Sequence, residues 1–169
     1  MPDPYVISVI LNTNRRDDTL ACLDSLARGN YPRHSAIVLD NHSTDGSVDA
    51  IRKQYPDVQI VNLQENLGYA GNNNVGIRMA LDQGADWVFV LNEDTVQDAD
   101  CLARLIAVGE KDASIGILGP MVYHFDEPDY IQSGGGMLGP NWESIHVAKD
   151  EPDRGQLSET RPVEWVSGC

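Results

Sequence analysis

The sequence predicts an α/β fold built on a mainly parallel sheet with helices on its faces. Short apolar runs alternate with segments of helical periodicity over about the first 120 residues, and strands that alternate with helices imply βαβ units. Most runs are followed by glycine or polar residues, as expected where a strand turns into a loop. The 169-residue chain is 41% hydrophobic, which is enough to form one sizeable core. We therefore expect a single domain over residues 1–169.

The first four elements alternate between strand and helix. A nearly continuous apolar run predicts a strand that is covered on both faces. The next segment repeats apolar residues at helical spacing, with Asp17 or Asp18 available to cap its start and Gly29 at its end. A short apolar strand follows, and then a helix that stops at Pro56. In chain order these elements are strand Tyr5–Leu11, helix Asp17–Arg28, strand Ala36–Asp40 and a helix from Val48 to Tyr55.

The alternation continues as far as residue 118. In chain order the further elements are strand Val58–Leu63, helix Gly71–Leu81, strand Asp86–Leu91, helix Asp98–Val108 and strand Ile115–Leu118. Beyond residue 120 glycines cluster, and Asn141–Arg161 is polar and largely aperiodic. A loop of that length is usually functional or disordered. Val163–Val166 is a candidate last strand.

The formal net charge of −14 restricts the possible partners. It argues against nucleic acid, which requires a basic surface, and it repels phosphorylated ligands unless a metal, an arginine or a helix N-terminus helps. The longest apolar runs are far too short to span a bilayer, so no transmembrane segment is expected. Cys22 and Cys101 fall in predicted helices as small buried thiols. We expect a cytoplasmic location, or a peripheral one at the inner face of the membrane for a longer protein.

Open parallel sheets bind ligands beyond the carboxyl ends of their strands. The residues that follow the predicted strands are polar or glycine-rich, so we expect them to gather on one edge of the sheet. They are Asn12, Thr13 and Asn14 after the first strand, Asp40 and Asn41 after the second, Gly68, Tyr69, Ala70 and Gly71 after the third, and Asn92, Glu93 and Asp94 after the fourth.

The usual nucleotide-binding signatures are missing. The chain has neither G-x-G-x-x-G after its first strand nor G-x-x-x-x-G-K-[ST] anywhere, which argues against a classical dinucleotide fold and a Walker-type loop. Glu93 and Asp94 instead offer hard oxygen ligands that suit Mg²⁺ or Mn²⁺ together with phosphate oxygens. A pair of solvated surface acids is the alternative interpretation.

Four segments occur in an order that is typical of one enzyme family. They are Ser8–Asn14 (SVILNTN), Asp40–Ser47 (DNHSTDGS), Asn66–Gly71 (NLGYAG) and Leu91–Thr95 (LNEDT), with Ser133–Gly135 and Trp165–Gly168 downstream. Together they resemble the family 2 inverting glycosyltransferases of the GT-A fold, especially bacterial rhamnosyltransferase-like members. The resemblance covers essentially the whole chain.

The resemblance implies a nucleotide-sugar-binding role for the first three segments, and also for Asn92 and Glu93 of the fourth. Residues 12–14 would border the base, with Thr13 as the foremost contact. Asp40 would accept a hydrogen bond from N3–H of uracil or thymine, and capping of the following turn is the alternative. The turn 68–71 would let the backbone approach the nucleotide near a helix N-terminus, although tight packing of a strand against a helix would call for the same glycines.

The fourth segment resembles a metal-binding motif. Asp94 matches the last acid of the family's D-x-D-type motif and would bind Mg²⁺ or Mn²⁺, while Glu93 would assist or stand behind it. Two positions depart from the family pattern. Asn92 stands where many relatives have Asp, which would leave the metal mainly to Asp94, and Asn72 stands where a second glycine is common, which would narrow the site.

The implied reaction is direct displacement at the anomeric carbon of a UDP- or dTDP-sugar, such as dTDP-rhamnose, by a glycan or lipid-linked acceptor. In the resembled family the catalytic base follows the Trp-x-x-Gly landmark, so we expect it beyond Cys169, with the chain truncated before the acceptor region. A nucleotide-sugar-binding or regulatory module without transfer activity is the alternative. A nucleotidyltransferase is disfavoured because the first strand lacks a glycine-rich, basic phosphate loop. Arg15 and Arg16 follow that strand and could reach a phosphate, but exposed loop arginines are usually only solvated.

Overall fold

The computed structural model describes residues 2–168, and the chain forms two compact units. The first contains the residues up to Ile106, and the second is Ala107–Gly168. All of the ligand-binding segments predicted from the sequence belong to the first unit.

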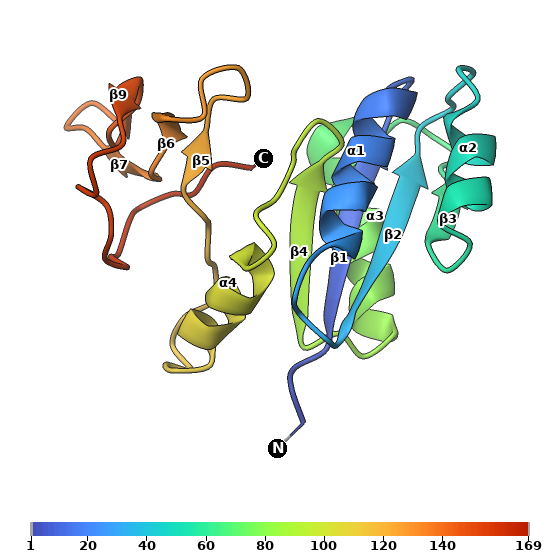
Figure 1. Ribbon diagram of the computed structural model, residues 1–169, viewed down its shortest axis with the longest axis horizontal. Coiled ribbons are helices and arrows are strands. Elements are labelled where there is room, and N and C mark those ends of the chain that lie inside the picture. The colour runs from blue at the N-terminus through green and yellow to red at the C-terminus, as the bar shows by residue number, and fades with distance from the viewer. Residues whose placement is uncertain (1, 169) are drawn as a thin grey trace. The chain divides into compact units, whose positions relative to one another are not determined.

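The first unit is built on a four-stranded, fully parallel sheet with strand order β3-β2-β1-β4. Its strands are β1 (Val6–Asn12), β2 (His34–Asp40), β3 (Gln59–Asn62) and β4 (Trp87–Asn92). The chain runs outward from β1 to β3 and then returns to the other side of β1 as β4 (Figure 1). This reversal places a topological switch point between β1 and β4, which is where open α/β sheets bind their ligands.

Helices cover both faces of this sheet (Figure 1). On one face Ile10 of β1 packs with Cys22 and Ile51, and on the other face Val9 packs with Ala80. Burial of both faces explains why β1 is apolar along nearly its whole length. The helices are α1 (Arg16–Ala27), α2 (Ser47–Gln54), α3 (Gly68–Asp82) and α4 (Cys101–Gly109).

Helix α3 approaches the sheet closely at Gly76. A Cβ at this position would lie 2.4 Å from Cγ1 of Val9 and 3.0 Å from Cδ1 of Leu39. Both distances are shorter than ordinary van der Waals contacts, so the missing side chain sets how near α3 lies to β1 and β2.

The second unit contains short antiparallel strands. β5 (Val122–Tyr123), β6 (Tyr130–Ser133) and β9 (Glu151–Pro152) form one sheet, and β7 (Gly136–Leu138) pairs with β8 (Ser144–His146). The indole of Trp165 covers Gly136, where a Cβ would lie 1.9 Å from the ring, and meets the ring of His146 edge-on at 4.6 Å between centroids. The two downstream landmarks of the sequence therefore lie side by side.

The predicted fold class is confirmed. The first four strands and all four helices of the sequence analysis are present, with ends shifted by a few residues. Helix α3 begins at Gly68 rather than at Gly71, so most of the predicted turn is its first turn. The prediction that Asp17 or Asp18 caps α1 was wrong, because both lie inside the helix and its first backbone N–H donates to Asp45 instead.

Two predicted strands are absent from the part of the chain that the structure describes. Ile115–Leu118 forms no strand, and its Ile117 is 77% exposed. An apolar run that short needs a neighbouring strand, and none pairs with it. Val163–Val166 is reduced to an isolated bridge at Trp165. Asn141–Arg161, which was predicted to be an aperiodic loop, contains β8 and β9.

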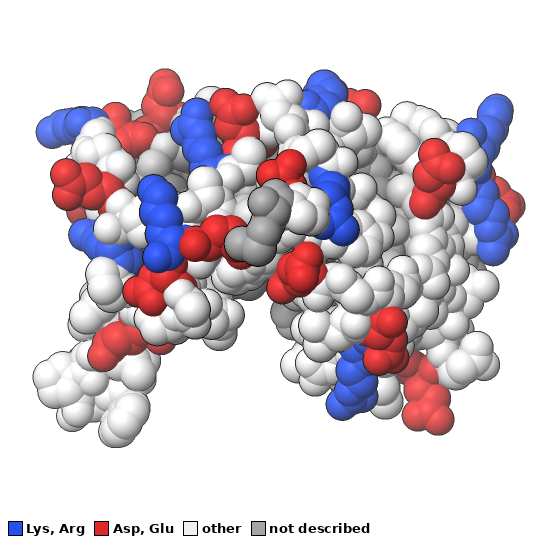
Figure 2. All heavy atoms as spheres, turned by 90° about the horizontal axis from the view of Figure 1, so that it is seen from below, with Lys and Arg blue, Asp and Glu red and all other residues white. Residues whose placement is uncertain are grey.

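Two further observations concern the helices and the surface charges. Within residues 2–168, no helix combines the length and the apolar character needed to cross a membrane. Figure 2 shows the face at the amino ends of the parallel strands, where lysine and arginine side chains are scattered among aspartate and glutamate.

Candidate functional site

The carboxyl ends of the parallel strands carry a row of polar side chains in register. Asn12 pairs with Asp40 across β1 and β2, and Asp40 pairs with Asn62 across β2 and β3. On the other side of β1, Leu11 pairs with Asn92 of β4. The predicted segments after β1, β2 and β4 are therefore neighbours at one edge, and the segment after β3 stands at the end of the row.

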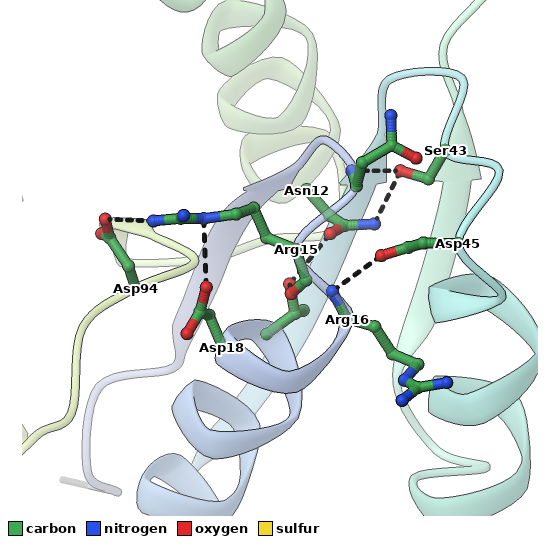
Figure 3. Close-up of polar contacts among 9 residues, drawn as sticks. Asn12, Arg15, Arg16, Asp18, Ser43, Asp45 and Asp94 are labelled. Carbon is green, nitrogen blue, oxygen red and sulfur yellow. Dashed lines mark hydrogen bonds and ion pairs between the residues drawn. The ribbon is translucent and has the colours of Figure 1, made fainter.

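Asn12, the last residue of β1, is completely buried and ties this edge together (Figure 3). Its Nδ2 donates to Oδ1 of Asp40 at 2.8 Å and lies 3.0 and 2.9 Å from the hydroxyls of Ser43 and Ser47. Its Oδ1 accepts from the hydroxyl of Thr19 in α1 at 2.9 Å. Asn12 was predicted to border a base, but its side chain has no exposed surface, so it can influence a ligand only through these partners.

Asp40 is only 4% exposed. One carboxylate oxygen accepts from Asn12, and the other accepts from the backbone N–H of Ser43 at 3.1 Å, which is the capping role that the sequence left open. A carboxylate has further lone pairs, so a hydrogen bond from a base to Asp40 stays a prediction. Beside it, the partly exposed Asn41 donates to the hydroxyl of Thr13 at 3.3 Å. The Oδ1 of Asn41 has no hydrogen-bond partner among the described residues.

Asn14 joins the loop after β1 to the loop after β2. Its backbone has a left-handed φ of 54°, which asparagine tolerates better than most residues. Its N–H donates to the hydroxyl of Ser43 at 3.0 Å, and its Oδ1 accepts from the N–H of Thr44 at 2.7 Å. Asn14 therefore helps to hold the two loops together, whether or not it also contacts a base.

Asp45 caps two helices at once. Its carboxylate accepts from the backbone N–H of Arg16, the first residue of α1, at 2.9 Å, and from that of Ser47, the first residue of α2, at 3.0 Å. A hydrogen bond from the Ser47 side chain, followed by these backbone bonds, holds the pKa of Asp45 below its ordinary value. Asp45 thus fixes both helix N-termini next to the site.

The acidic pair lies after β4, across the switch point from Asn12. Asp94 is half exposed, and burial raises the pKa of the Glu93 carboxyl. The Oδ1 of Asn92 is a buried oxygen with no partner in the described chain. Residues 2–168 contain no group of three Asp, Glu, His or Cys side chains arranged to hold a metal. The oxygens of Asp94 and Glu93 fit the mode in which Mg²⁺ or Mn²⁺ uses one or two carboxylates and completes its shell with phosphate and water.

Arg15 makes ion pairs with two acids that the sequence did not indicate as its partners. Its Nε lies 3.0 Å from Asp18, and its Nη2 lies 3.2 Å from Asp94, so the guanidinium bridges the loops after β1 and β4 (Figure 3). The sequence did contain a hint of this contact. Arg15 lies three residues beyond the end of β1, and the acids lie just beyond the end of the neighbouring strand β4. It borders an open depression of about 410 Å³ that is lined by Asn14, Arg15, Arg16, Asp17, Asp18 and Asp45.

The segment before α3 is held by Asn72. This buried side chain accepts from the N–H of Leu67 at 2.9 Å and donates to Oδ1 of Asn66 at 3.3 Å. A Cβ on Gly71 would lie 2.6 Å from Cβ of Leu67. Close packing therefore accounts for Gly71, whereas Gly68 has open space around its Cα and a φ of +74°.

Helix α1 anchors the loop that carries the acids. The thiol of Cys22 lies 3.8 Å from the carbonyl oxygen of Asn92 and 3.9 Å from the hydroxyl of Thr95. The N–H of Gln97 donates to the hydroxyl of Ser25 at 3.1 Å. Burial raises the pKa of the Cys22 thiol to about 11, so it remains a protonated, structural thiol as the sequence predicted.

Comparison with known proteins identifies the family. Residues 8–161 match the family model of Glycosyl transferase family 2. The chain belongs to this family. Galactofuranosyltransferase GlfT1 of Mycobacterium tuberculosis is 35% identical over 126 residues, which cover 73% of this chain and 41% of that protein. The N-acetylglucosaminyl-diphospho-decaprenol L-rhamnosyltransferase of the same species is 33% identical over 153 residues, which cover 79% of this chain and 50% of that protein. This family 2 chain thus spans half or less of the length of these relatives.

Solved structures share the fold of this family 2 chain. The mannosyltransferase PcManGT of Pyrobaculum calidifontis, in complex with GDP-Man and Mn²⁺, has a TM-score of 0.59 at 24% identity and covers 72% of this chain and 36% of its own. S. aureus TarS 1-349, in complex with UDP-GlcNAc, has a TM-score of 0.57 at 17% identity. The match covers 73% of this chain and 41% of the TarS chain. The GT-A fold and the resemblance to rhamnosyltransferase-like members of family 2 are both confirmed.

Proposed function

We propose that this chain is the nucleotide-sugar-binding part of an inverting glycosyltransferase. Its donor is a UDP- or dTDP-sugar, with dTDP-rhamnose a candidate, and its acceptor is a glycan or a lipid-linked glycan. The observation that carries the proposal is the row of polar side chains at the carboxyl edge of the sheet, next to the switch point, in a chain of family 2. One relative is a galactofuranosyltransferase and another is an L-rhamnosyltransferase named for N-acetylglucosaminyl-diphospho-decaprenol, which supports a lipid-linked acceptor.

The base is proposed to lie against the edge formed by Thr13, Asp40 and Asn41. A uracil or thymine ring presents N3–H as a donor, whereas N3 of cytosine is an acceptor. Two acceptors lie at this edge: the carboxylate of Asp40 and the Oδ1 of Asn41, which has no partner among the described residues. Both are buried in this structure, so contact with a base requires the loops that cover them to open. A solved structure with this fold binds GDP-Man, so the choice of base must come from side chains and not from the fold.

The diphosphate is proposed to lie near Asp94 and Arg15, at the switch point. Asp94 would hold a divalent cation, with Glu93 assisting or standing behind it. When bound, such a cation supplies positive charge that stabilises a departing nucleoside diphosphate. The Mn²⁺ in the complex of the mannosyltransferase supports this assignment. Arg15 adds a second positive charge at the same place, in a chain whose net charge is −14.

Calorimetric titration with UDP, dTDP, CDP and GDP, each with Mn²⁺ and with EDTA, tests the proposal. We expect UDP or dTDP to bind best and their affinity to fall strongly in EDTA. If UDP and dTDP bind equally well in Mn²⁺ and in EDTA, Asp94 does not hold a metal ion for the nucleotide. A preference for CDP or GDP would remove the proposed choice of base and leave only a nucleotide site.

A further inference from the structure

We infer that Asn12 is a positioning residue for selection of the nucleobase, because it fixes the edge formed by Asp40 and Asn41. The inference rests on the proposed function, which assigns the choice of base to that edge. Asn12 is completely buried, so it acts through its neighbours and not by touching the ligand.

The hydrogen-bond partners of Asn12 determine which way its amide points. The Asp40 carboxylate oxygen, 2.8 Å away, can only accept, so the side-chain nitrogen must face it. On the opposite side the single hydrogen of the Thr19 hydroxyl is shared between Oδ1 at 2.9 Å and the carbonyl oxygen of Arg15 at 2.8 Å. A flipped amide would set its oxygen against the carboxylate, so the side chain has a single orientation.

This amide also has more acceptors than protons. Asp40, Ser43 and Ser47 all lie within 3.0 Å of an NH₂ group that carries two hydrogens. The charged carboxylate is the strongest acceptor of the three, so one hydrogen is committed to Asp40 and the hydroxyls share the other. The position of the carboxylate therefore depends on Asn12 more than the positions of the two serines do.

The backbone extends this control to Asn41. The N–H of Asn41 donates to the carbonyl oxygen of Asn12 at 2.9 Å, and the second oxygen of Asp40 accepts from the N–H of Ser43. Asn41 is thus held by Asn12 from one side and by the turn that Asp40 caps from the other. A shift of Asn12 would move both acceptors that are proposed to read the base.

Few other side chains could replace Asn12. Leucine has a similar size but no donor, so a buried oxygen of Asp40 would lose its partner. Aspartate would place a second carboxylate against the first. Threonine would keep one donor with a single hydrogen, which makes it the conservative variant.

The test measures the melting temperature and the ratio of affinities for UDP and CDP, both with Mn²⁺. Asn12→Leu removes the donor to Asp40, whereas the control Ser47→Ala removes another partner of the same amide and leaves that bond intact. We expect Asn12→Leu to reduce the UDP-to-CDP ratio about tenfold, the order expected when a buried polar group loses its partner. Ser47→Ala should lower the melting temperature while the ratio stays within about twofold.

If Asn12→Leu has the same UDP-to-CDP affinity ratio as the wild type, even with a lowered melting temperature, Asn12 is purely structural and the inference is overturned. If Asn12→Leu does not fold, Asn12→Thr is measured in its place. A partial loss of the ratio is then expected, and an unchanged ratio overturns the inference. A wild-type protein that fails to prefer UDP over CDP contradicts the proposed function itself, whereas a preference that survives in the variant contradicts this inference alone.

Discussion

The guanidinium of Arg15 lies 3.2 Å from the carboxylate of Asp94, although the two residues belong to loops on opposite sides of the switch point. Asp94 is the proposed ligand of a divalent cation, and in this structure an arginine provides its counter-charge. Both side chains are about half exposed, so the pair contributes only about 0–1 kcal/mol to stability. A metal ion at the proposed site would therefore compete with Arg15 for the carboxylate of Asp94.

Arg15→Met should strengthen the binding of Mn²⁺ alone. Removal of the competing cation is expected to raise the affinity for Mn²⁺ by up to about fivefold, which matches the small energy of an exposed ion pair. Titration followed by electron paramagnetic resonance, without nucleotide, measures this directly. Arg16→Met is the matched control, because Arg16 pairs with Asp17. Identical Mn²⁺ affinity in the two variants would show that Arg15 does not compete with the metal.

Asp94→Asn should reproduce the effect of a chelator. The amide keeps the size of the side chain but loses the negative charge that a hard cation requires. The affinity of the variant for UDP in Mn²⁺ should equal that of the wild type in EDTA, as measured by calorimetry. Asp17→Asn, an exposed change in the same region, should behave like the wild type. If the affinity of Asp94→Asn for UDP still rises when Mn²⁺ is added, the metal binds at other residues.

Asp40 and Asn41 should differ in their effects on stability. Asp40→Ala leaves the Asn12 amide and the Ser43 N–H without their acceptor, so the free energy of unfolding should fall by about 1–3 kcal/mol. Asn41→Ala removes a partly exposed amide and should change stability far less. We expect both to reduce the preference for UDP over CDP. If Asp40→Ala unfolds more easily but keeps the full preference, its role is to cap the turn.

The sheet could be predicted because its signals are local. A continuous apolar run such as Val6–Leu11 specifies a strand that is buried on both faces, and alternation with helices specifies parallel order. The parallel register then brings the strand ends together. The predicted row at the carboxyl edge followed from these rules without knowledge of any side-chain contact.

Contacts between loops could not be predicted in this way. Asp17 and Asp18 stand beside the start of α1 in the sequence, yet Asp45 caps it, because the pairing of β1 with β2 brings the loop after β2 to that helix. The contact between Arg15 and Asp94 likewise depends on the strand order. Ile115–Leu118 has the composition of a strand but no partner, since strand formation requires pairing that a short run does not encode.

Gly76→Ala should destabilise the first unit. Its new Cβ would lie 2.4 Å from a methyl group of Val9, so α3 must move away from the sheet, and we expect a loss of about 1–3 kcal/mol. Urea denaturation followed by circular dichroism measures the change. Gly116→Ala is the control, because a Cβ there meets nothing within 4 Å. Equal stability of the two variants would mean that α3 packs less tightly than the structure shows.

The double cap formed by Asp45 should make stability depend on pH. The pKa of Asp45 in the folded chain lies below its ordinary value of 3.8. The stabilisation by the Asp45 carboxylate is therefore complete at pH values above 3.8, and it is lost as the pH falls through the lower pKa of the folded state. Asp45→Asn should reduce the free energy of unfolding by about 1 kcal/mol at pH 7. Urea titrations at pH 7 and at about pH 3 measure this free energy. The difference in free energy of unfolding between the variant and the wild type should be smaller at the lower pH. Asp57→Asn, which alters an exposed residue between α2 and β3, should show no such change.

The position of β1 between β2 and β4 affects how the chain behaves while it is being synthesised. Val6 pairs with His34 on one side, but its other neighbour is Trp87, which emerges only after α2, β3 and α3 have been made. Until then one edge of an apolar strand is open, and such an edge readily associates with other chains. The nascent protein is therefore exposed to aggregation through this edge while residues 41–92 are being translated.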